Sequence, residues 1–98
     1  MNPRRIQQLF DLHGKTALIT GGSRGLGLQM AHALGEAGAR LIVSSSKADD
    51  LKAACAELHA AGIEADWIAA DGQSESDMTG LADQAIERLG RIDVLVNN

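Results

Sequence analysis

An apolar run, Thr16-Ala17-Leu18-Ile19, leads directly into the glycine-rich string Thr20-Gly21-Gly22-Ser23-Arg24-Gly25-Leu26-Gly27. A segment with helical spacing of apolar residues follows, so we expect the string to lie on a strand-to-helix turn. Amides at the N-terminus of a helix point outward unpaired, and the helix dipole places about half a positive charge there. Such a turn is suited to bind phosphate. No Gly-Lys-Ser/Thr sequence closes the turn, which excludes a P-loop.

Three glycines of the turn have separate expected roles. Gly21 lets the chain leave the strand sharply, Gly25 lets the backbone approach a pyrophosphate, and Gly27 lets the helix pack closely on the strand. The alternative interpretation is a glycine-rich turn that binds nothing. The order strand, turn, helix favours a nucleotide-binding turn.

Strand and helix patterns alternate along the rest of the chain. We expect strands at residues 15–20, 40–45, 64–70 and 92–96, and helices at residues 25–37, 47–61 and 75–89. Short links in such an alternation imply parallel strands joined by right-handed crossovers. The prediction is an α/β fold: a Rossmann-type doubly wound parallel sheet, of which these are the first four strands in the order 3-2-1-4.

Two regions follow from this interpretation. Residues 1–14 form an N-terminal lead-in with a short helix on which Ile6, Leu9 and Phe10 share a face. Residues 15–98 form the N-terminal part of a dinucleotide-binding Rossmann domain, truncated after its fourth strand. The fourth strand is then expected to have an unpaired edge, with Val94 and Val96 exposed.

The spacing of apolar residues predicts which face of each helix is buried. The expected inward residues of the first helix are Leu26, Met30, Ala33, Leu34 and Ala37. Those of the second are Leu51, Cys55 and Leu58, and those of the third are Met78, Leu81, Ala82, Ala85, Ile86 and Leu89. Ser74 is expected to cap the third helix.

Composition narrows the range of partners. The net charge is −4 and the basic residues are scattered, which argues against a nucleic-acid partner. One cysteine permits neither an intrachain disulfide nor a cysteine metal cluster, and the three histidines have no ligand spacing, so no metal is expected. No membrane span or signal peptide is recognised, and the expected location is the cytoplasm.

The end of the second strand discriminates between dinucleotides. A carboxylate there binds the ribose 2′-hydroxyl in many dinucleotide folds, whereas this chain has Ser44-Ser45-Ser46-Lys47. Hydroxyls and a nearby cation accept a 2′-phosphate that a carboxylate would repel, and Arg24 supplies a second cation. Both features favour NADP(H), with NAD(H) as the alternative. In the alternative interpretation, without a role in cofactor binding, the serines cap the second helix and Arg24 is solvated.

The glycine spacing, T-G-x-x-x-G-x-G, resembles the signature of short-chain dehydrogenases/reductases. The resemblance covers residues 10–98 and includes Asp71 after the third strand and Asn97-Asn98 after the fourth. It implies that Asp71 accepts a hydrogen bond from the adenine amino group, that Gly72 contributes a backbone contact, and that Asn98 touches the ribose side and fixes the turn. Asp71 could alternatively cap the loop or helix that follows it. Many NADP-dependent relatives carry an arginine where Ser46 stands. The full set of expected cofactor-binding residues is Gly21, Ser23, Arg24, Gly25, Leu26, Gly27, Ser45, Ser46, Asp71, Gly72 and Asn98.

The resemblance also implies an activity, namely reversible hydride transfer between nicotinamide and a carbonyl or secondary alcohol. Within the family, the sequence most resembles NADP(H)-dependent carbonyl and 3-oxoacyl reductases and sugar-acid enzymes of the gluconate 5-dehydrogenase type. The resemblance implies a small-molecule substrate and a homo-oligomer. The family uses a tyrosine as general acid/base, with a lysine, a serine and an asparagine around it. This chain has no tyrosine, so no catalytic residue is assigned within it and these residues are expected beyond Asn98. The alternatives are a nucleotide-binding module without catalysis and, less favoured, a Rossmann-like methyltransferase.

Overall fold

The structure is a computed structural model and describes residues 11–98. Its elements are β1 (Thr16–Thr20), α2 (Gly25–Glu36), β2 (Arg40–Ser45), α3 (Ala48–Ala60), β3 (Ala65–Ala69), α4 (Glu75–Leu89) and β4 (Val94–Asn97). Each element expected between residues 15 and 98 is present, with bounds within two residues of the expectation. The predicted helix of the lead-in, with Ile6, Leu9 and Phe10, lies outside the described residues.

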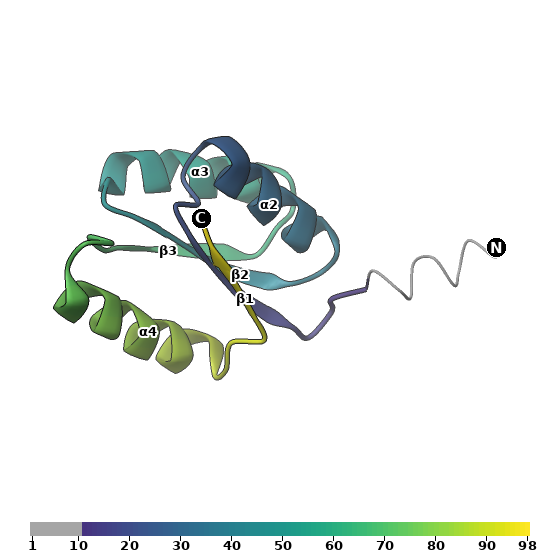
Figure 1. Cartoon of the computed structure of the whole chain (residues 1–98). Coiled ribbons are helices and arrows are strands. Elements are labelled where there is room, and N and C mark those ends of the chain that lie inside the picture. The colour runs from purple at the N-terminus through teal and green to yellow at the C-terminus, as the bar shows by residue number, and fades with distance from the viewer. Residues whose placement is uncertain (1–10) are drawn as a thin grey trace, which may run out of the picture.

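The four strands are parallel and lie in the order β3-β2-β1-β4, which confirms the predicted topology. Helices α2 and α3 cover one face of the sheet and α4 covers the other (Figure 1). Side chains of β1 alternate between the two faces, so Ala17 and Ile19 pack under α2 and α3 while Leu18 packs toward α4. Because both faces of the central strands are covered, the sheet is a rigid base for the loops at its carboxyl ends.

The predicted inward face of α2 is wrong in part, since Leu34 packs against the core and Met30 and Ala37 are half-buried, but the other two residues are not inward. Leu26 is 62% exposed and Ala33 is exposed, whereas Gly27 and Ala31 are buried. The reason is the close approach of α2 to the strand-to-helix turn: a Cβ on Gly27 would lie 2.1 Å from the carbonyl oxygen of Gly21. The helix therefore buries Gly27 and Ala31 most deeply, and Leu26 turns outward, while Leu28 and Leu34 pack against the core with part of their surface exposed.

The other two helices mostly follow the prediction. Leu51, Cys55 and Leu58 of α3 are buried, as expected. Ser74 caps α4 by accepting a hydrogen bond from the Asp77 amide at 3.2 Å. Ile86 is the exception, because it is 50% exposed while its neighbour Ala85 fills the core position.

The two sheet edges differ. At β4, Val94 and Val96 are half-buried against the core beneath α2 and α3, and Leu95 on the opposite face is 63% exposed. The expected exposure of the two valines is therefore wrong. Helix α4 packs over residues of β1, β2 and β3, which leaves the outer strand uncovered on that face.

At the opposite edge, side chains contact three of the outward backbone groups of β3, namely Ala65 O, Trp67 N and Trp67 O. The outward residues are the odd-numbered ones, since Glu64 O and Ala70 N bond to β2. His59 Nε2 lies 2.7 Å from Ala65 O, and Asp66 Oδ1 accepts from the Trp67 amide at 2.8 Å. Arg88 Nη1 lies 3.4 Å from Trp67 O and pairs with Asp66 Oδ2 at 2.6 Å. We call His59, Asp66 and Arg88 the β3 edge cap.

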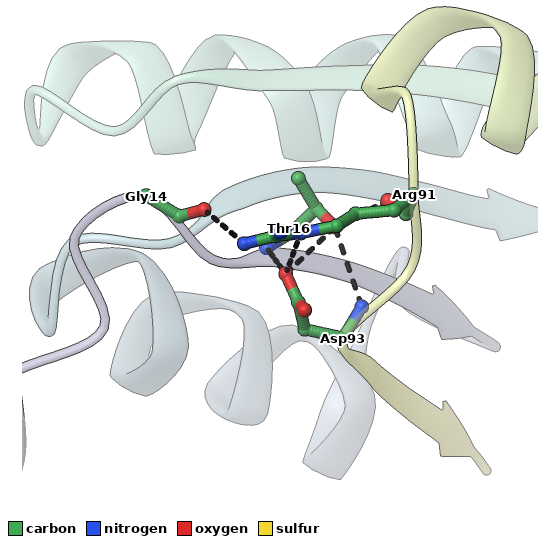
Figure 2. A network of polar contacts seen from close by, with 4 residues as sticks. All are labelled: Gly14, Thr16, Arg91 and Asp93. Atoms are coloured by element: carbon green, nitrogen blue, oxygen red, sulfur yellow. Dashed lines mark hydrogen bonds and ion pairs between the residues drawn. The ribbon is translucent and has the colours of Figure 1, made fainter.

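A polar network around Asp93 joins the start of β1 to the start of β4 (Figure 2). Asp93 Oδ2 accepts from the Thr16 amide at 2.9 Å and from Arg91 Nε at 3.2 Å. The Thr16 hydroxyl donates to the carbonyl oxygen of Arg91, whose Nη2 donates to Gly14 O at 3.4 Å. The hydrogen bond from the Thr16 amide, helped by the Arg91 guanidinium, holds the pKa of the Asp93 carboxyl below its usual value. The network thus anchors β4 beside β1 at the end opposite the glycine turn.

Candidate nucleotide-binding site

The candidate site begins with the backbone of the glycine turn. Gly21 has φ +64°, and a Cβ there would lie 3.0 Å from Asn98 O and 3.2 Å from Asn98 Nδ2. Gly25 has φ +58° and open space around its Cα. Together with the contact between Gly27 and Gly21, these values agree with the roles expected for the three glycines in shaping the turn. Gly25 is the one that leaves room for a ligand against the backbone.

Asn98 lies directly against the turn. Its Nδ2 donates to Gly21 O at 3.3 Å, and its backbone amide donates to the hydroxyl of Thr20 at 3.3 Å. The same hydroxyl lies 3.1 Å from Asn97 Oδ1. The residue after β4 therefore braces the residue after β1, as the resemblance implies for Asn98.

The N-terminus of α2 opens toward solvent beside this turn. Arg24 occupies the N-cap position with extended backbone, and its side chain makes no capping hydrogen bond. The first turn of the helix contains no acidic residue. The helix therefore offers free amides and an uncompensated partial positive charge to an anion.

Two adjoining pockets lie at the carboxyl ends of the strands. The first, of about 380 Å³, is lined by Gly21, Ser23, Arg24, Gly25, Leu26, Ser45, Ser46, Lys47, Asp50 and Asn98. The second, of about 450 Å³, is lined by Thr20, Gly21, Ser44, Ser45, Ser46, Ala70, Asp71, Gly72, Gln73, Met78, Asn97 and Asn98. Gly27 is the one expected site residue that lines neither, because it is buried beneath the turn. The structure therefore brings the other ten expected residues together.

The serines at the end of β2 do not cap helix α3, in contrast to the alternative interpretation. Helix α3 has Lys47 as its N-cap, and no side chain caps it. The Ser45 hydroxyl instead accepts from the Lys47 amide at 3.2 Å within a local turn, and Ser46 is exposed. Arg24 lines the same pocket as both serines, and no hydrogen bond or ion pair holds its side chain among the described residues.

Asp71 has the local geometry of its alternative interpretation. Its Oδ1 accepts from the Gln73 amide at 2.9 Å, and its own amide donates to Asp77 Oδ2 at 3.0 Å. The carboxylate thus shapes the loop before α4, and it also lines the second pocket. The two interpretations are compatible, since a carboxylate has lone pairs for several donors.

Sequence reasoning missed two lining residues that bear on recognition. Met78 lines the second pocket beside Gly72, and Asp50 lines the first pocket beside Arg24. The spacing of apolar residues predicts that Met78 points inward from its helix. Which strand ends it meets depends on how α4 crosses the sheet. Asp50 carried a weak signal, because it comes four residues after Ser46 in the first turn of α3.

The thiol of Cys55 is buried and lines neither pocket. Burial raises the pKa of the Cys55 thiol to about 11, so it remains protonated near neutral pH. Residues 11–98 gather no group of three or more His, Cys, Asp or Glu side chains that could hold a metal ion. Over the same residues, no helix has the length and apolar character needed to cross a membrane.

The sequence matches the model of one protein family over most of its length. A family model described as short chain dehydrogenase matches residues 15–98. The chain belongs to the short-chain dehydrogenase family. The members of this family named among its relatives are oxidoreductases, and the chain carries the family's fold and glycine turn.

Individual short-chain dehydrogenases show how far the similarity extends. The chain is 40% identical over 93 residues to an uncharacterized oxidoreductase of Mycobacterium tuberculosis, covering 95% of this chain and 35% of that protein. The crystal structure of a hydroxysteroid dehydrogenase from Escherichia coli gives a TM-score of 0.88 at 39% identity, covering 91% of this chain and 38% of that one. A variant of actinorhodin polyketide ketoreductase with NADPH gives 0.84 at 39% identity, covering 86% and 32%. The chain spans about a third of the length of the curated relatives it matches.

Proposed function

We propose that this chain is the cofactor-binding part of an NADP(H)-dependent oxidoreductase that moves a hydride between NADP(H) and a carbonyl or secondary alcohol. The pyrophosphate would lie on the amide end of α2, where Gly25 leaves the backbone open and the first turn of the helix contains no acid. The substrates would be small molecules such as ketones, 3-oxoacyl compounds or sugar acids, and the working enzyme a homo-oligomer.

The observation that carries the cofactor choice is the charge at the end of β2. Arg24 and Lys47 line the first pocket together with the hydroxyls of Ser45 and Ser46. A carboxylate at either serine would suit a ribose 2′-hydroxyl and repel a 2′-phosphate. The two cations and two hydroxyls instead favour the phosphate, which supports NADP(H) over NAD(H). The relative with NADPH mentioned above has a similar fold.

The second pocket would hold the adenine. Asp71 offers a carboxylate to the amino group of the base, and Gly72 offers backbone. Gly72 has no side chain to cover the face of the base, whereas Met78 lines the same pocket with a flexible apolar side chain. Ser45, Ser46 and Asn98, which line both pockets, would lie nearest the ribose between them.

The first test removes the cation of the glycine turn. Arg24→Ala should raise the Kd for NADP⁺ by about ten- to a hundredfold, because a charge-assisted contact to phosphate is worth about 1.5–3 kcal/mol. The Kd for NAD⁺ should change far less, since that nucleotide has no 2′-phosphate. Isothermal titration of the 98-residue chain with both nucleotides measures the two constants. Equal losses for both would show that Arg24 does not recognise the 2′-phosphate.

A converse variant and a control complete this test. Ser45→Asp should shift the ratio of the two constants toward NAD⁺, because the new carboxylate suits a free 2′-hydroxyl. Arg40→Ala removes an exposed arginine that pairs with Glu64 at 3.0 Å and lines neither pocket, so it should leave both constants unchanged. An unchanged ratio for Ser45→Asp would mean that the end of β2 does not touch the ribose.

A nucleotide-binding module without catalysis is the second candidate, because the glycine turn and the two pockets alone would account for nucleotide binding. The candidates differ in hydride transfer. An oxidoreductase that contains this chain should oxidise NADPH when it is given a ketone. The loss of absorbance of the reduced nicotinamide measures this oxidation. A binding module should bind the nucleotide without oxidising it.

A further inference from the structure

The first pocket contains a charge that its proposed ligand does not need. Asp50 lines it together with the cations Arg24 and Lys47. The carboxylate belongs to the first turn of α3 and is half-buried, whereas its neighbour Asp49 is exposed and lines neither pocket. The pocket is therefore lined by two cations and one anion.

Asp50 also acts on the field of its own helix. Lys47 is the N-cap of α3 and no side chain caps the helix, so its first amides carry a partial positive charge at the pocket, and the first turn contains two acids, Asp49 and Asp50. A carboxylate in the first turn offsets that charge. Both acids offset the charge of the helix end, but only Asp50 lines the pocket, so only its carboxylate acts directly on a group bound there.

We propose that Asp50 is a specificity-determining residue that weakens binding of the nucleotide 2′-phosphate and so limits the preference for NADP(H) over NAD(H). A 2′-phosphate among Arg24, Lys47 and Asp50 is attracted by two charges and repelled by the third. A 2′-hydroxyl carries no charge, so the carboxylate does not repel it and can accept its hydrogen bond. The proposal rests on the proposed function, because it assigns the first pocket to the 2′ position of the ribose.

The test compares two neighbouring acids in the same helix turn. Asp50→Asn should lower the Kd for NADP⁺ by about three- to tenfold, the range expected for one partly solvated charge near a phosphate. The Kd for NAD⁺ should change by less than about twofold or rise slightly. Asp49→Asn removes the same formal charge from the exposed side of the turn and should leave the ratio of the two constants nearly unchanged. Isothermal titration in low salt gives all six constants.

Two further measurements separate the electrostatic effect from a structural one. Asp50→Ser, with a small residue that first turns tolerate, should give the same gain for NADP⁺. The gain should shrink as salt is raised from about 0.01 M to about 0.5 M, because screening weakens the repulsion. A gain that is insensitive to salt would mean that the variant acts by changing the shape of the pocket and would overturn the proposal.

The outcomes also separate this proposal from the one on which it rests. If Arg24→Ala weakens NADP⁺ binding selectively but Asp50→Asn leaves the ratio unchanged, the cofactor assignment stands and the role of Asp50 is wrong. If Asp49→Asn matches Asp50→Asn, or if both nucleotides gain equally, the effect is one of general charge and the proposal is overturned. If the unaltered chain binds neither nucleotide, both proposals fail.

Discussion

Gly25 combines a left-handed backbone with empty space, and the two properties have different consequences for a substitution. Gly25→Val should reduce the affinity for NADP⁺ and NAD⁺ sharply and alike, because the branched side chain would occupy the space where the backbone meets the pyrophosphate. Circular dichroism should show that the fold is retained. Titration with both nucleotides measures the loss, and near-normal affinity would mean that the turn is not the phosphate site.

A matched control comes from Gly62, which also has positive φ and open space but lies far from the glycine turn in the loop after α3. Gly62→Val introduces the same backbone strain, of about 1–3 kcal/mol. Its nucleotide affinity should remain near that of the unaltered chain. If both variants lose nucleotide affinity equally, the cause is destabilisation of the fold and not steric exclusion of the pyrophosphate at Gly25.

The lowered pKa of Asp93 makes a prediction about stability and pH. A carboxyl whose pKa is lower in the folded chain stabilises the fold above its unfolded value of about 4, and this contribution is lost as pH falls through the lower, folded value. Asp93→Asn should therefore lower the Tm most at neutral pH. The difference from the unaltered chain should shrink as the pH falls below about 4.

Thermal melts between neutral and acidic pH measure this difference. Asp83→Asn provides the control, because it removes a carboxylate from the exposed surface of α4. It should change the Tm little across the range. A constant gap between Asp93→Asn and the unaltered chain down to the lowest pH would show that the charge of Asp93 does not stabilise the fold.

At the scale of elements, α4 contains Gly80 and is capped by Gly90, and the two glycines have opposite expected responses to alanine. Gly80 lies within the helix and a Cβ there would meet nothing within 4 Å, so Gly80→Ala should stabilise the chain by about 0.5–1 kcal/mol. Gly90 is the C-cap, with φ +82° in equally open space. Gly90→Ala should destabilise the chain by about 1 kcal/mol, because alanine is strained there. Urea unfolding measures both, and the same sign for both would contradict this account.

Helix α2 shows where periodicity fails as a guide to packing. Counting Leu26 and Ala33 as inward relies on the spacing of apolar residues alone. The structure buries Gly27 and Ala31 instead, because the turn brings the helix too close to the strand for larger side chains. Helix α3 has no such approach, and there the spacing of Leu51, Cys55 and Leu58 predicted the buried face correctly.

At the scale of the whole molecule, the order of the strands could be predicted because alternating strands and helices permit few parallel topologies. Ten of the expected site residues lie together for the same reason, since the carboxyl ends of the strands meet at one edge of the sheet. Asp50 and Met78 could not be assigned in this way. Their positions depend on the angles at which α3 and α4 cross the sheet, and no local pattern in the sequence specifies those angles.

The β3 edge cap makes the two edges of the sheet unequal in their capacity to pair with another strand. The outward carbonyls of Ala65 and Trp67 and the Trp67 amide already have side-chain partners, so an incoming strand would have to displace them. Beside β4, the Val96 carbonyl accepts from the Thr20 hydroxyl at 3.3 Å, but among residues 11–98 no side chain bonds to the outward amide or carbonyl of Val94, so hydrogen-bonding capacity remains there. Any strand that extends this sheet, whichever chain supplies it, therefore meets more occupied backbone groups at β3 than at β4.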